Sequence, residues 1–118
     1  MEKRRILIVD DEKETRDLLK FYFEKEGFEV LEAINGKDAE EKIKSDNIDL
    51  IVMDIVMPEE NGIELLKSLR FERIPIIVIS GKKGFKEILL EEEEYNIIDF
   101  FEKPFKVKEL VERVKEIL

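Results

Sequence analysis

Short apolar runs recur along the chain and predict five β-strands. They are rich in isoleucine and valine and cover residues 6–9, 28–33, 50–53, 76–79 and 97–101. Three of the runs contain no polar residue, which is typical of strands buried on both faces of a parallel sheet. The second run carries Glu29 and Glu32 and is therefore expected at a less buried edge of the sheet.

The segments between these runs predict helices. From Thr15 to Gly27, apolar residues recur with the spacing of an amphipathic helix that ends at the glycine. The expected buried positions of this helix are Leu18, Leu19, Tyr22 and Phe23. Further helices are expected after Asn35-Gly36, after Gly62, around 85–93 and from about Phe105 onwards. The segment 85–93 has its apolar residues clustered at 88–90 rather than in a clean stripe, so the pattern indicates this helix least clearly of the five.

Strands that alternate with helices in this way predict one α/β domain over residues 1–118. Right-handed crossovers make a doubly wound (βα)5 parallel sheet the natural arrangement. No apolar run reaches the roughly 20 residues that cross a bilayer. We therefore expect a soluble cytoplasmic protein that does not bind membranes.

Composition narrows the possible chemistry. With 21 Lys and Arg against 30 Asp and Glu, the formal charge is −9, which opposes direct binding of nucleic acid. There is no cysteine and no histidine, which excludes disulfides, thiolate metal sites and histidine-based triads. Any chemistry must use carboxylates, hydroxyls and lysines. The 43% charged residues and the absence of glutamine favour a thermophilic source.

Polar residues follow the ends of four predicted strands. Asp10 and Asp11 follow the first, Asp54 the third, Ser80 the fourth, and Lys103 comes just after the fifth. In open α/β sheets, ligands bind beyond the carboxyl ends of the strands, so these groups are expected to converge. Taken singly, each has an ordinary role: an aspartate caps a helix, a serine sits in a turn, and a lysine is a surface charge.

Three carboxylates gathered in one place require a cation. Two of them about 5 Å apart repel by roughly 3 kcal/mol at an effective dielectric of 20. Oxygen ligands without histidine or cysteine suit a hard ion, and Mg²⁺ is the usual choice where phosphate chemistry follows. A carboxylate beside such an ion can attack phosphorus and form an acyl phosphate.

These residues resemble the receiver domains of bacterial two-component response regulators, the CheY-like family. The resemblance covers residues 6–118 and rests on four segments in the right order and separation. They are Ile-Leu-Ile-Val-Asp-Asp-Glu at 6–12, Asp-Ile-Val-Met-Pro at 54–58 with Gly62, Ser80, and Lys103-Pro104-Phe105. The resemblance implies a flavodoxin-like fold with strand order 2-1-3-4-5.

The resemblance also implies the site. Asp54 would accept the phosphoryl group in a Mg²⁺-dependent reaction. Asp11 and Asp54 would ligate Mg²⁺ through carboxylate oxygens, the backbone carbonyl of Val56 would be a third ligand, and Asp10 would act through water. The apolar Val56 side chain predicts slow loss of the phosphoryl group.

The remaining family positions imply a switch. Ser80 would bind a phosphoryl oxygen, Lys103 would pair first with the carboxylates and then with the phosphoryl group, and Phe100 would turn inward. The surface made of the helix around 85–93, the strand 97–101 and the helix from about Phe105 would then change its affinity for a partner. A sensor histidine kinase or a histidine phosphotransfer protein would be the donor, and the target is unknown. The Lys103-Pro104 bond is expected to be cis.

Several alternatives stay open. A phosphohydrolase of the haloacid-dehalogenase type would carry a second acid where Val56 stands, so we expect a protein that catalyses only its own phosphorylation and dephosphorylation. A receiver-like scaffold that never takes phosphate is a second alternative. Nucleotide binding is disfavoured because neither glycine-rich phosphate-binding pattern is present. We expect a stand-alone single-domain regulator, with a fragment of a larger transcriptional regulator as the alternative.

Overall fold

The computed structural model of the chain describes residues 3–55, 62–70, 72–81 and 95–118. Its elements are β1 (Arg5–Val9), α1 (Lys13–Lys25), β2 (Glu29–Ala33), α2 (Gly36–Ser45), β3 (Leu50–Asp54), α3 (Gly62–Leu69), β4 (Ile76–Ser80), β5 (Ile97–Glu102) and α5 (Val107–Ile117). The helix expected around 85–93 lies outside the described residues. Among the described residues, no helix is both long enough and apolar enough to span a membrane.

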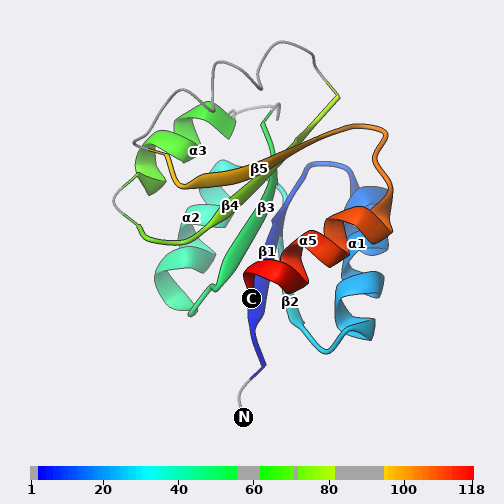
Figure 1. The fold of residues 1–118 in the computed structure, drawn as a ribbon. Coiled ribbons are helices and arrows are strands. Elements are labelled where there is room, and N and C mark those ends of the chain that lie inside the picture. Colours follow the sequence, from blue (N-terminus) through cyan, green and yellow to red (C-terminus); the bar gives the residue numbers. More distant parts are fainter. Residues whose placement is uncertain (1–2, 56–61, 71, 82–94) are drawn as a thin grey trace.

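The five strands form one parallel sheet in the order β2-β1-β3-β4-β5, as expected (Figure 1). β1 and β3 lie next to each other, with Val9 paired with Met53 at their carboxyl ends. All residues of β3 and β4 are buried, which explains why these runs contain so few polar residues. β2 is an edge strand, exposed at Glu29 and only partly buried along most of its length, which confirms its predicted position.

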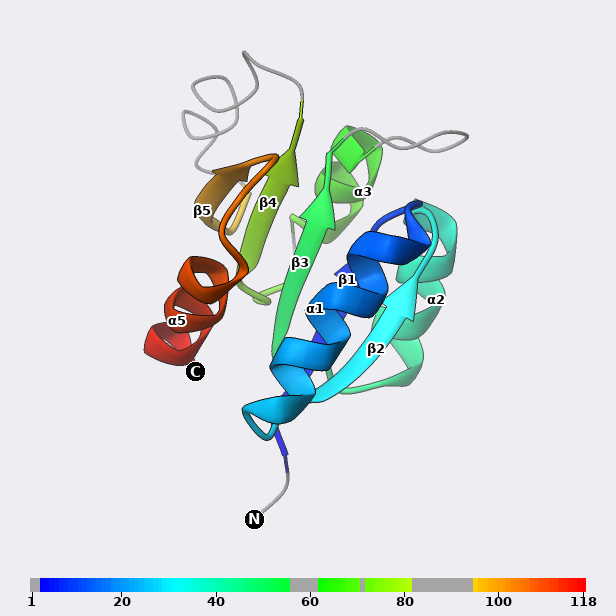
Figure 2. The same cartoon turned by 90° about the vertical axis from the view of Figure 1, so that its right-hand side faces the viewer.

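Helices cover both faces of the sheet, with α1 and α5 on one side and α2 and α3 on the other (Figure 2). Alternate residues of each strand enter different cores. In β1, for example, Leu7 packs toward α2 and α3, whereas Ile6 and Ile8 pack toward α1 and α5. The predicted doubly wound architecture is therefore confirmed.

Two helix predictions need correction. α1 begins at Lys13, two residues before the predicted start, and Leu18 is 46% exposed rather than part of its buried face. The other predicted positions are confirmed, since Leu19 and Phe23 are fully buried and Tyr22 is partly buried against the same core. α5 begins at Val107 rather than near Phe105. The α1 termination at Gly27 is confirmed, since its φ of 93° is a conformation that glycine adopts without strain.

Candidate active site

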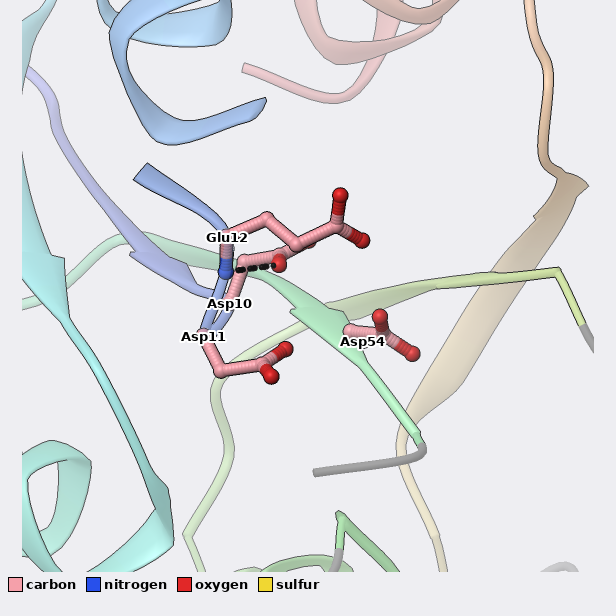
Figure 3. A group of neighbouring side chains, drawn as sticks. All are labelled: Asp10, Asp11, Glu12 and Asp54. Atoms are coloured by element: carbon pink, nitrogen blue, oxygen red, sulfur yellow. Dashed lines mark hydrogen bonds between the residues drawn. The ribbon is translucent and has the colours of Figure 1, made fainter. Parts of the chain in front are cut away.

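The carboxyl ends of β1 and β3 bring four acidic side chains together. Asp10, Asp11 and Glu12 come from the turn after β1, and Asp54 is the last residue of β3 (Figure 3). One carboxylate oxygen from each lies within 4.8 Å of the others. Asp10 and Asp54 are buried, while Asp11 and Glu12 are exposed. The convergence predicted from the parallel sheet is therefore present.

Lys103 supplies the positive charge of this site. Its Nζ donates to Asp54 Oδ2 at 2.9 Å, to Asp10 Oδ2 at 3.0 Å and to Glu12 Oε1 at 3.3 Å. Burial lowers the pKa of Lys103, but its hydrogen bonds to Asp54 and Asp10 outweigh burial and hold the pKa above the ordinary value. The ammonium is therefore charged at neutral pH.

Asp10 is held from several directions. Its N–H donates to the Ala33 carbonyl at 3.1 Å, and its Oδ1 accepts the Glu12 N–H at 2.8 Å (Figure 3). Burial nevertheless raises the pKa of Asp10 above the ordinary value, outweighing the lowering by the Glu12 N–H and by Lys103. One ammonium shared among three carboxylates thus compensates the buried charge of Asp10 only in part.

Ser80 and Lys103 are linked through the backbone. Ser80 is buried at the end of β4, and its carbonyl accepts the Lys103 N–H at 2.8 Å. The Lys103-Pro104 peptide bond is cis, as expected. The hydrogen bond from the Lys103 N–H to the Ser80 carbonyl holds the loop that carries the lysine next to the strand that carries the serine.

The expected roles of two further site residues stay predictions. Val56, predicted to give a backbone carbonyl to the metal and to slow phosphate loss, lies outside the described residues. Phe100 is only 7% exposed and packs in the core on the side of α2 and α3. Its predicted movement on phosphorylation stays a prediction.

The donor set fits a hard divalent cation. The candidate ligands are carboxylate oxygens, and the chain has no histidine or cysteine that would favour a softer metal. Mg²⁺ is typically held by one or two carboxylates together with waters and phosphate oxygens. An exposed Asp11 beside the buried Asp10 and Asp54 offers such a partly open site.

Sequence reasoning gave no role to two residues near this site. Glu12 was part of the acidic run, but its contact with Lys103 joins the first turn of the chain to the loop after β5. Arg16 donates from Nη1 to the Asp10 carbonyl at 2.7 Å. Its only sequence signal is its position one helical turn after the acidic run.

The fold and the site together define a class of protein. Strand order reverses between β1 and β3, and this is where ligands bind in doubly wound sheets. The acidic cluster, with its lysine, lies at that switch point. The molecule is thus a flavodoxin-like α/β domain with a charged ligand site at the carboxyl end of its sheet.

Comparison with known proteins places the chain within this class. The family model described as "Response regulator receiver domain" matches residues 6–115. The chain therefore belongs to the response regulator receiver domain family, as its sequence motifs predicted.

Individual relatives agree with this assignment. The transcriptional regulatory protein SrrA of Staphylococcus aureus is 42% identical over 114 residues, which cover 96% of this chain and 47% of SrrA. The chain thus spans about half the length of the curated relatives it matches.

Solved structures show the same fold. A CheY-like receiver domain protein from Methanospirillum hungatei superposes with a TM-score of 0.88 at 29% identity, covering 98% of this chain and 94% of that one. The response regulator TrrA from Thermotoga maritima, in complex with Mg²⁺ and BeF, gives a TM-score of 0.84 at 34% identity, covering 98% and 99% of the two chains.

Proposed function

We propose that the chain is a phosphorylation switch in which Asp54 accepts a phosphoryl group. The observation that carries the proposal is the setting of Asp54: it ends β3, is 6% exposed, lies 2.9 Å from the Lys103 ammonium and shares a carboxylate cluster with Asp10 and Asp11. The phosphoryl donor is a sensor histidine kinase or a histidine phosphotransfer protein, the donors used by this family.

The reaction is a phosphoryl transfer between two protein side chains. A carboxylate oxygen of Asp54 bonds to phosphorus while the bond from phosphorus to the donor histidine nitrogen breaks, and that nitrogen keeps the electron pair. Asp11, Asp54 and the Val56 carbonyl would hold Mg²⁺, with Asp10 acting through water. When bound, the ion neutralises the carboxylates and the incoming phosphoryl oxygens. The chain thus catalyses only its own modification.

Lys103 and Ser80 support the modified state. The new group brings a charge of about −1.5 to −2 and strong acceptor oxygens. Lys103 is already charged and 2.9 Å from Asp54, so it pairs with the phosphoryl group after small movement. The Ser80 hydroxyl donates to a second phosphoryl oxygen. Because Ser80 ends β4 and Lys103 directly follows β5, their movement would change a partner-binding surface made of β5, α5 and the helix expected around 85–93.

Incubation with Mg²⁺ and acetyl phosphate, followed by intact mass measurement, tests this function. We expect a gain of one phosphoryl group, about 80 Da, that disappears in Asp54→Ala and when Mg²⁺ is chelated. Asp17→Ala is the matched control because Asp17 is an exposed aspartate on α1.

Three outcomes separate the alternatives. An adduct that survives in Asp54→Ala would place the acceptor elsewhere. No adduct with acetyl phosphate, together with no response to beryllofluoride, would support a scaffold that binds its partner unmodified. Sustained hydrolysis of a generic phosphate ester would instead support a phosphohydrolase.

A further inference from the structure

A largely buried arginine stands behind the acidic turn. The Arg16 side chain is 11% exposed, although it lies on a surface helix. Its Nη1 donates to the Asp10 carbonyl at 2.7 Å and its Nε donates to Glu32 Oε1 at 3.2 Å. One guanidinium therefore ties the acidic turn, helix α1 and edge strand β2 together.

The Asp10 carbonyl lies just beyond the last backbone hydrogen bond between β1 and β2. Backbone pairing between β1 and β2 ends at Val9 and Ala33, followed by the bond from the Asp10 N–H to the Ala33 carbonyl. The next carbonyl of the chain, that of Asp10, is bonded to Arg16. The guanidinium thus restrains one more backbone group beyond the β1–β2 ladder, the carbonyl of the residue that begins the acidic turn.

Glu32, which accepts the hydrogen bond from Arg16 Nε, is itself held in place. Glu32 also lies 3.7 Å from Lys20 Nζ, and its carbonyl accepts a hydrogen bond from Lys42 of α2. Glu32 is therefore held in β2 by two helices. A guanidinium is planar and presents its donors at fixed angles. Because Glu32 holds one side of the Arg16 guanidinium, the other side restricts where the Asp10 carbonyl can lie.

We propose that Arg16 is a positioning residue that sets the Mg²⁺ affinity of the acidic turn. This role rests on the proposed function, because it requires that the cluster binds the ion. The carboxylates of Asp10, Asp11 and Asp54 repel one another before an ion arrives, so an unrestrained turn would separate them. Arg16 keeps the turn in the gathered arrangement, and ion binding then requires less reorganisation.

Titration of the 118-residue chain with Mg²⁺ tests the role directly. Binding would be followed by calorimetry and by the amide resonances of residues 10–12, without any phosphodonor. In Arg16→Met we expect the Kd for Mg²⁺ to rise about tenfold or more, the range seen when outer-shell partners of metal ligands are removed. Arg16→Lys keeps the charge but loses the planar fork, so we expect it to remain within a few-fold of Arg16→Met.

Lys25→Met is the matched control. It removes an exposed positive charge from the last turn of the same helix, away from the acidic turn, and we expect its Kd to stay within about twofold of the wild type. Urea unfolding in EDTA reports the stability of each variant separately from its Mg²⁺ affinity. Should Arg16→Met fail to fold, Glu32→Gln weakens the same anchor while keeping the arginine, and a raised Kd is again expected.

The outcomes distinguish this role from the proposed function. A wild type that shows no saturable Mg²⁺ binding overturns both. A wild type that binds Mg²⁺, with an unchanged Kd in folded Arg16→Met or Arg16→Lys, overturns only the role of Arg16. Loss of stability without a change in Kd would make the arginine purely structural and also overturns the proposal.

Discussion

Replacing Lys103 with methionine removes the ammonium but keeps a side chain of similar length. Asp10 and Asp54, buried with carboxylate oxygens within 4.8 Å of each other, would then face one another without a cation. At an effective dielectric of 20, two unit charges at that distance repel by about 3 kcal/mol. Protonating a carboxylate of ordinary pKa at pH 7 would cost about 4 kcal/mol, and protonating Asp10 costs less because burial raises its pKa. Protonation of Asp10 therefore limits the cost, and we expect a loss of at most about 3 kcal/mol in unfolding free energy.

Urea denaturation at pH 7, with EDTA and with saturating Mg²⁺, measures this loss. In EDTA the variant should show the full destabilisation. With Mg²⁺ the destabilisation should shrink, because the ion binds the folded state and replaces the ammonium as the partner of the carboxylates. Lys108→Met is the control: Lys108 is an exposed lysine of α5, and its substitution should change stability by no more than about 0.5 kcal/mol in either buffer.

The test is decided by comparing the loss of unfolding free energy in EDTA with the loss in Mg²⁺. An equal loss in EDTA and in Mg²⁺ would mean that Lys103 contributes packing rather than charge compensation, and the electrostatic reasoning would be refuted. Lowering the pH toward 4 should also reduce the loss in EDTA, since the unpaired carboxylates of the variant then take up protons.

Two further predictions concern the buried aspartate and the core. Burial raises the pKa of Asp10, so its ionisation destabilises the folded state increasingly as pH rises through that pKa. Asp10→Asn should therefore unfold at a higher temperature than the wild type in EDTA at pH 7, and this advantage should vanish at low pH. Leu110→Ala should cost about 2–5 kcal/mol in urea unfolding because Leu110 is fully buried. Leu18→Ala, at a 46% exposed position, should cost less than about 1 kcal/mol.

The sheet and the acidic cluster could be predicted because both follow from where apolar runs stop. A parallel sheet aligns its carboxyl ends, so acids directly after the first and third runs had to meet if those strands were neighbours. Neither step requires knowledge of side-chain conformation. This is why Asp10, Asp11, Asp54 and Lys103 were predicted together and are found together.

The directions of individual side chains could not be predicted from the spacing of apolar and polar residues along the chain. Leu18 and Leu19 are both apolar, and only the packing of α1 on the sheet decides that Leu19 is buried and Leu18 is exposed. Arg16 reads as an ordinary helix-surface charge, yet the nearby Asp10 carbonyl and Glu32 carboxylate draw it inward. The position of Phe100 likewise depends on the space left by its neighbours, which spacing along the chain does not encode.

The span of chain between Lys103 and its partners has a consequence for folding. The lysine meets Asp10 across 93 residues and Asp54 across 49 residues, so both contacts close long loops and are expected to form late. A folding intermediate with β1 and β3 paired, but with the C-terminal third still unfolded, would already hold the repelling carboxylates without their ammonium. Docking of the last strand and helix therefore relieves electrostatic repulsion as well as burying apolar surface, and the site becomes complete only when the whole sheet has formed.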